Sequence, residues 1–153
     1  MSTTNEQKIK VAVLGATGMV GQRMLQRLSI HPFFEIAYLG ASSRSAGKPY
    51  QEATKWRLEG RCPKNIKDIL VHDCSNIKAA MSDQSSALFA DIPIVFSALD
   101  SKVAGDIEDA VIQLARKNDR LVYVISNASN SCSILSQLNL GGEALIKFCS
   151  KES

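Results

Sequence analysis

The sequence predicts an α/β fold: a doubly wound, Rossmann-type, mostly parallel sheet with helices on both faces. Short apolar runs that are typical of buried strands alternate along the chain with segments of helical periodicity. Parallel strands need crossover connections, and these are right-handed, so the alternation indicates strands joined through helices. Four of the expected strand ends carry small or polar residues. They would share the one edge at which such sheets bind ligands.

The first strand, loop and helix carry the clearest signal. An apolar strand over residues 9–14 runs into a loop with Gly15, Gly18 and Gly21, and a helix is expected over residues 18–30. Gly15 allows a tight turn, Gly18 lets the backbone approach a pyrophosphate, and Gly21 lets the helix pack closely on the strand. The free N–H groups of the helix N-terminus then face the anion. Taken alone, this glycine spacing also fits a plain strand-to-helix turn.

The segment after the first helix contains less regular patterns. A second strand is expected over residues 34–39, and the polar segment 41–61 is expected to be an extended loop anchored by Trp56. A short strand follows at 69–71. The Ser-rich stretch 74–90 is expected to hold one or two short helices.

The second half of the sheet is built around one well-marked helix. Strands are expected over residues 92–96 and 121–125, and between them a helix from Ser101, as its N-cap, to Lys117. Acidic residues in its first half and basic residues at its end suit the helix dipole. Its apolar stripe is expected to consist of Val103, Ile107, Ala110, Val111 and Leu114.

Composition narrows the function classes. The 153 residues suit one domain, and the net charge of +3 is not gathered into a Lys/Arg block, so we expect neither a nucleic-acid nor a membrane partner. No signal-peptide pattern or run of transmembrane length is present, so we expect a cytoplasmic protein. The four cysteines form no CxxC pair, and we expect no metal site.

The end of the second strand indicates which dinucleotide is bound. The sequence after it is Ser42, Ser43, Arg44 and Ser45, without the acid that would bind the ribose hydroxyls of NAD. The planar guanidinium of Arg44 and the neighbouring hydroxyls suit a 2′-phosphate. The residues therefore favour NADP; the alternative is an ordinary exposed loop arginine.

Four motifs together resemble the N-terminal domain of aspartate-semialdehyde dehydrogenase, in its fungal and archaeal branch. They are the segments 8–21, 39–47, 95–105 and 124–128. The resemblance covers residues 8–129 and implies an NADP-binding domain there. It further implies a pyrophosphate site at Thr17, Gly18, Met19 and Val20, a 2′-phosphate site at Ser42, Ser43 and Arg44, and an adenine and nicotinamide side at Ser97, Ala98, Leu99 and Asn127.

The resemblance also implies a reaction, the reduction of L-aspartyl 4-phosphate by NADPH to aspartate semialdehyde for lysine, threonine and methionine synthesis. In the family a cysteine in an Asn-Cys motif forms a thioester. Residues 130–153 lack that motif, so we expect an atypical tail in place of the catalytic and dimerisation domain. Cys149 is a weak alternative nucleophile because it has no preceding Asn. Residues 143–148 are expected to form one or two helical turns, and residues 1–7 a disordered tail.

Two functions therefore remain, a domain of the oxidoreductase family named above and a binding module. The chain alone is expected to be inactive in the family reaction, and self-association or homo-oligomerisation through an uncovered surface is expected. The alternative is a non-catalytic NADP-binding module or a regulatory or aberrant fragment. A short-chain reductase is excluded, because Tyr38, Tyr50 and Tyr123 are not followed by a lysine four residues later.

Overall fold

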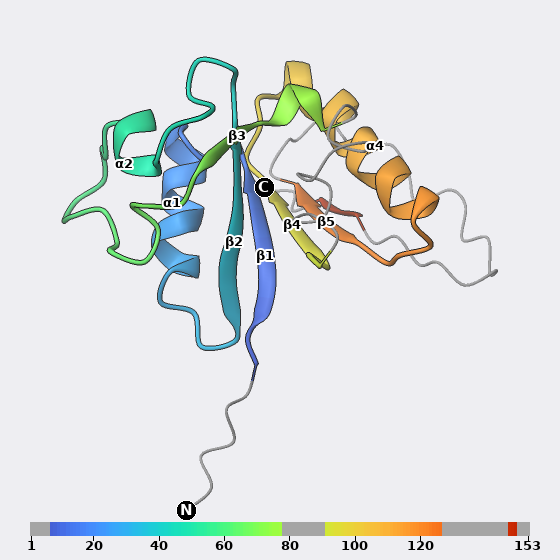
Figure 1. The fold of residues 1–153 in the computed structure, drawn as a ribbon, viewed down its shortest axis with the longest axis horizontal. Helices are drawn as coiled ribbons and strands as arrows, with labels where there is room; N and C mark the ends of the chain where they lie inside the picture. Colours follow the sequence, from blue (N-terminus) through green and yellow to red (C-terminus); the bar gives the residue numbers. More distant parts are fainter. Residues whose placement is uncertain (1–6, 78–90, 127–146, 150–153) are drawn as a thin grey trace, which may run out of the picture.

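The computed structural model describes residues 7–77, 91–126 and 147–149, which form one six-stranded sheet in the order β3-β2-β1-β4-β5-β6 (Figure 1). All five strand pairings are parallel. The predicted Rossmann-type α/β fold is confirmed. The strands are β1 (Ile9–Leu14), β2 (Phe34–Ala41), β3 (Val71–Asp73), β4 (Ile94–Ser97), β5 (Tyr123–Ser126) and β6 (Lys147–Cys149).

Helices cover both faces of the sheet. Helices α1 (Met19–Leu28) and α2 (Tyr50–Ala53) lie on one face, and α4 (Ser101–Lys117) lies on the other (Figure 1). Side chains alternate along β1, so that Val11 and Val13 belong to the apolar cluster under α1, whereas Ala12 and Leu14 belong to the cluster under α4. All four are fully buried. The central strand is therefore apolar throughout because it packs on both sides.

The strand order creates a switch point between β1 and β4. From β1 the chain winds outward through β2 to β3, and then returns to the other side of β1 to form β4 and β5. The connections after β1 and β4 lead to α1 and α4, on opposite faces of the sheet (Figure 1), and the crevice between such connections is where doubly wound sheets bind ligands. Leu14 and Ser97 pair at this position.

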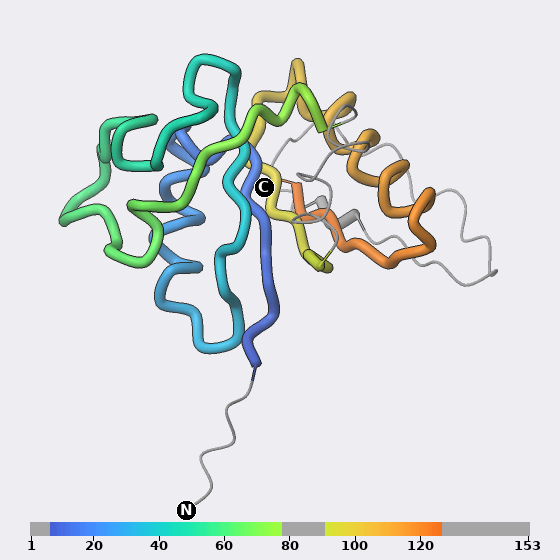
Figure 2. The backbone as a smooth tube through the Cα atoms, in the orientation of Figure 1, coloured from blue at the N-terminus to red at the C-terminus, as the bar shows by residue number. Residues whose placement is uncertain are grey.

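The segment between β2 and β3, whose path Figure 2 traces, is not a plain loop. It contains α2, and Pro49 forms an antiparallel bridge with Leu70. Trp56 packs half-buried against the cluster under α1, but the deepest anchor is Tyr50, which is 1% exposed. The expected strand at 69–71 begins two residues later, as β3.

Helix α4 has its expected bounds and most of its expected buried stripe, but a different cap. The carboxylate of Asp100 accepts a hydrogen bond from the Lys102 N–H at 3.1 Å, so Asp100 is the N-cap and the expectation of Ser101 was wrong. Val103, expected in the apolar stripe, is 46% exposed. The other expected members pack on the sheet, and Ala104 and Glu108 join them: Ala110, Val111 and Leu114 are buried, and Ile107 is partly buried.

The expectation of helical turns over 143–148 was wrong for its last residues. Lys147 to Cys149 form β6, which pairs in parallel with β5 and places Cys149 beside Ser126. An unpaired strand edge presents free N–H and C=O groups, and β6 satisfies those of β5. In the Ser-rich stretch, a 3₁₀ helix spans Cys74–Asn76, and residues 78–90 lie outside the described part. No helix among the described residues is long and apolar enough to cross a membrane.

Candidate functional site

Two of the three glycines in the first loop are required by its geometry. Gly15 has φ +75°, and a Cβ there would lie 2.5 Å from the carbonyl oxygen of Ala98, across the switch point. A Cβ on Gly21 would collide with the carbonyl oxygen of Gly15, so the helix could not approach the loop so closely. These positions match the roles expected of a tight turn and of close packing.

Gly18 differs from the other two glycines, because the protein itself does not require it. Its φ of −77° is accessible to any residue, and a Cβ would find only the Gly15 carbonyl oxygen, at 3.7 Å. Gly18 is exposed and is the N-cap of α1. The space beside its Cα is therefore open to a ligand.

The N-terminus of α1 is electropositive. In the described structure its N-cap has no side-chain hydrogen bond and its first turn has no acidic residue. The first N–H groups of a helix have no partner within the helix, and the dipole adds partial positive charge there. Met19 and Val20 are 50% and 42% exposed, so this end of α1 faces the surface. The arrangement suits a phosphate or another anion.

The serine and arginine segment forms a turn at the end of β2. The N–H of Ser45 donates to the carbonyl oxygen of Ser42 at 2.9 Å. Ser42, Ser43 and Arg44 are exposed and Ser45 is half-buried. Because β2 pairs with β1, this turn shares an edge of the sheet with the glycine-rich loop. Arg44 is thus exposed at the edge of the sheet that carries the glycine-rich loop.

The end of β4 closes the other side of the switch point. The N–H of Ala98 donates to the carbonyl oxygen of Leu14 at 2.8 Å, which holds the β4 end against β1. Ser97 is 1% exposed, and its Oγ has no hydrogen-bond partner among the described residues. Leu99 packs, partly buried, against the cluster under α4. Ser97 pairs with Ser126, whose Oγ donates to the buried Glu108 carboxylate at 2.6 Å.

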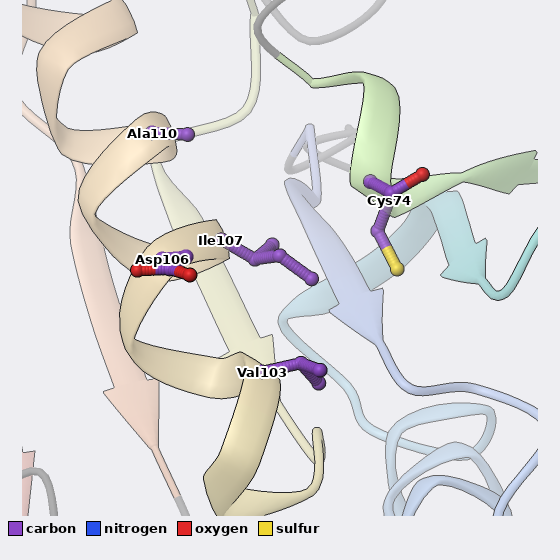
Figure 3. A pocket seen from close by; sticks show the side chains of 6 residues that line it. Cys74, Val103, Asp106, Ile107 and Ala110 are labelled. Atoms are coloured by element: carbon purple, nitrogen blue, oxygen red, sulfur yellow. The ribbon is translucent and has the colours of Figure 1, made fainter.

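A pocket of about 290 Å³ lies between α4 and the 3₁₀ helix that follows β3 (Figure 3). Val103 and Ile107 reach from α4 toward Cys74 on the opposite wall. The remaining lining residues are Ser75, Asp106 and Ala110. An apolar slot at the carboxyl edge of a doubly wound sheet suits a flat ring. The sequence alone does not predict this pocket, because Val103 is expected in the apolar stripe of its helix and not at a surface.

The described cysteine side chains are not activated. The Sγ of Cys74 donates to the carbonyl oxygen of Ala41 at 3.0 Å, and burial raises the pKa of this thiol to about 11. Burial also raises the pKa of the Cys62 thiol. Thiolates are the nucleophilic form, so neither residue suits thioester chemistry. Cys149 lies in β6 beside Ser126, and Asn127 lies outside the described residues.

No group of three or more His, Cys, Asp or Glu side chains in the described segments could hold a metal ion. His31 stacks on Phe34, with ring centroids 4.4 Å apart, and His72 stacks on Tyr38 at 4.7 Å. Burial lowers the pKa of His72. The site is therefore assembled from backbone groups, hydroxyls, one arginine and an apolar slot.

The family model described as semialdehyde dehydrogenase, NAD binding domain, matches residues 10–131. The chain belongs to this family. Among semialdehyde dehydrogenases, the aspartate-semialdehyde dehydrogenase of Cryptococcus neoformans var. neoformans is 45% identical over 123 residues, which cover 80% of this chain and 30% of the relative. That of the archaeon Methanothermobacter thermautotrophicus is 46% identical over 100 residues, 65% of this chain and 26% of the relative.

A solved semialdehyde dehydrogenase structure is also similar to this chain. The crystal structure of aspartate-semialdehyde dehydrogenase with NADP from Candida albicans matches with a TM-score of 0.67 and 43% identity, over 81% of this chain and 30% of that chain. The expected resemblance to the fungal and archaeal branch is confirmed. The chain spans about 30% of the length of these semialdehyde dehydrogenases.

Proposed function

We propose that the chain binds NADP(H) at the carboxyl edge of its sheet, as the N-terminal domain of an aspartate-semialdehyde dehydrogenase. The observation that carries the proposal is the glycine-rich loop at the switch point, where the exposed Gly18 leads into the uncapped N-terminus of α1. The match to a relative crystallised with NADP supports the choice of ligand.

The pyrophosphate lies on the loop and on the first turn of α1. The backbone N–H groups of Thr17, Met19 and Val20 donate to its oxygens, and the open side of Gly18 admits it. Gly15 and Gly21 shape the loop without needing to touch the ligand. The dinucleotide supplies hydride chemistry when it is bound, and this chain's residues orient it.

The 2′-phosphate lies at the turn after β2. Arg44 donates a charged, planar pair of N–H groups, and Ser42, Ser43 and Ser45 add hydroxyl donors. The exposure of this turn, on the same edge as the glycine-rich loop, supports the assignment.

The adenine occupies the pocket between α4 and the 3₁₀ helix, where Val103 and Ile107 contact its ring. Ser97, Ala98 and Leu99, at the end of β4, lie along the dinucleotide between its adenine and its nicotinamide. Asn127 is assigned to the nicotinamide end. The buried Ser97 Oγ without a described partner supports a ligand or water contact there.

The activity to which this domain contributes is the NADPH-dependent reduction of L-aspartyl 4-phosphate, with release of phosphate, in lysine, threonine and methionine synthesis. Residues 8–129 form the NADP-binding domain, and residues 130–153 are an atypical tail. This chain by itself is inactive, which the raised pKa of both described thiols supports. Cys149 is the nucleophile to test if turnover is found.

The compartment and the assembly of the chain are proposed from its described cysteines and exposed apolar residues. The free thiols of Cys62 and Cys74 support a reducing compartment, the cytoplasm. Ile30 and Phe33, which are 80% and 60% exposed, support self-association.

A non-catalytic NADP-binding module is the second candidate. It is favoured by the absence, among the described side chains, of a cysteine with a lowered pKa. Assay of aspartate semialdehyde oxidation tests both candidates, because turnover that is lost in Cys149→Ala would exclude a mere binding module and would also contradict the proposed inactivity of this chain.

Isothermal titration of the chain with NADP⁺ and NAD⁺ tests the binding proposal. NADP⁺ binds more tightly, and Arg44→Ala removes about tenfold of that preference, as loss of one charged hydrogen bond predicts. Arg61→Ala is the matched control, since Arg61 is another exposed arginine of the same segment. Equal affinities in the wild type, or a preference that survives Arg44→Ala, would contradict the assignment.

A further inference from the structure

The segment between β2 and β3 contacts the glycine-rich loop from inside the protein. The hydroxyl of Tyr50, at the start of α2, donates to the carbonyl oxygen of Ala16 at 2.8 Å, and this hydrogen bond is buried. The ring packs in the cluster under α1, and only 1% of Tyr50 is exposed. Burial raises the pKa of Tyr50, so its hydroxyl remains a donor across the neutral range.

Two more side chains donate to the next carbonyl of the loop. The carbonyl oxygen of Thr17 accepts from Nε2 of Gln22 and from Oγ1 of Thr54, each at 3.4 Å. Gln22 is fully buried, although it is polar, and it also bonds the β2–β3 segment directly. Its Nε2 donates to the Lys55 carbonyl at 3.0 Å, and its Oε1 accepts from the Arg57 N–H at 2.9 Å.

These contacts determine which way the loop peptides face. In a trans peptide the C=O and the following N–H point in opposite directions. The Ala16 carbonyl points at the Tyr50 hydroxyl, so the N–H of Thr17 points away from Tyr50, out of the core. The Gly18 N–H is held by the Gly15 carbonyl at 3.2 Å. The loop is therefore held from behind with a donor on its outer side.

We infer that Tyr50, assisted by Gln22 and Thr54, is a positioning residue that holds the glycine-rich loop in its anion-binding form. The inference rests on the proposed NADP site and assigns the β2–β3 segment a second role there. The residues after Ser45 shape the pyrophosphate site from beneath, whereas the turn from Ser42 to Ser45 meets the 2′-phosphate. One segment thus serves both phosphate groups of the same ligand.

A hydroxyl deletion separates this role from general packing. Tyr50→Phe keeps the buried ring and removes only the donor to Ala16. NADP⁺ and adenosine 2′-phosphate are titrated into the 153-residue chain. The variant binds NADP⁺ about tenfold more weakly, as expected when a buried hydrogen bond is lost. It binds adenosine 2′-phosphate, which has no pyrophosphate, as the wild type does.

Tyr123→Phe is the matched control, because Tyr123 begins β5 at the opposite edge of the sheet. This variant binds both ligands with the affinity of the wild type. If Tyr50→Phe binds NADP⁺ like the wild type, or loses both ligands equally, the positioning role is wrong. If circular dichroism shows that Tyr50→Phe does not fold, Thr54→Val decides the question by the same comparison.

If the proposed NADP site is wrong, the wild-type chain itself gives a different result. A wild-type chain that binds neither ligand overturns the NADP site. The loop geometry is then decided without ligand by amide hydrogen exchange. Faster exchange of the Gly18 N–H in Tyr50→Phe than in Tyr123→Phe supports the positioning role, and equal exchange overturns it.

Discussion

Substitution of Gly18 by valine separates binding from folding more clearly than any other change in the loop. The φ of −77° is normal for valine, and its Cβ would meet only one atom, at 3.7 Å. Valine in place of glycine at a helix N-cap costs about 1 kcal/mol. For a domain of this size, that lowers the melting temperature by about 3 °C.

The effect on binding is much larger, because the isopropyl group fills the space that the pyrophosphate needs. If the ligand loses two charged hydrogen bonds to loop N–H groups, the loss is at least about 3 kcal/mol. Such a loss corresponds to about 100-fold in the dissociation constant for NADP⁺. Differential scanning fluorimetry and isothermal titration measure the two effects on the same sample.

Gly105→Val is the matched control for Gly18→Val. Gly105 lies on the exposed side of α4, where a Cβ would meet nothing within 4 Å. The same side chain is added there, and NADP⁺ affinity stays at the wild-type value. A folded Gly18→Val variant that binds NADP⁺ normally would show that the pyrophosphate does not need the space beside Gly18, and the loop would then be a plain turn.

Three other perturbations test the geometry. Gly15→Ala destabilises the fold by about 2 kcal/mol or more from positive φ alone, and further because its Cβ meets the Ala98 carbonyl; urea unfolding measures this, and a wild-type midpoint would contradict it. Burial raises the pKa of the Cys74 thiol from its ordinary 9.0 to about 11, so the stability that the neutral thiol gives the fold is complete below pH 9 and is lost as the pH rises toward 11. Between these pH values the melting temperature falls less steeply in Cys74→Ala than in the wild type, and equal slopes would exclude the contribution. Ser126→Ala removes the donor to the buried Glu108 carboxylate and costs about 1–3 kcal/mol in urea unfolding, and a change within error would show that the bond is dispensable.

The parts of the site that the sequence predicts are those coded by adjacent residues. A glycine at positive φ, a buried apolar strand before it and a helical stripe after it are local signals, so Gly15 and Gly21 were assigned their roles correctly. The fold class followed from the same local alternation. The sequence predicts the helix at 101–117 for this reason too, since its apolar repeat and its closing basic residues are local signals, although its cap is Asp100 and not Ser101.

The parts that the sequence does not predict depend on distant contacts. Tyr50 reaches Ala16 across 34 positions, and Gln22 reaches Lys55 across 33, so neither pattern is visible in a local window. The strand at 147–149 depends on the free edge of β5, not on its own few residues. The exposure of Val103, at the margin of the buried face of α4, depends on the pocket that the 3₁₀ helix after β3 forms beside it.

Amide chemical shifts of the ¹⁵N-labelled chain, followed during titration with NADP⁺, test whether the dinucleotide binds at the carboxyl edge of the sheet. We expect saturable shifts at Thr17 to Val20, at Ser42 to Ser45, and at Val103 and Ile107 beside the pocket. Phe33 and Tyr123, which lie at the opposite edge of the sheet, stay unshifted. Shifts confined to that opposite edge, or no saturable shift of the glycine-rich loop, would contradict it.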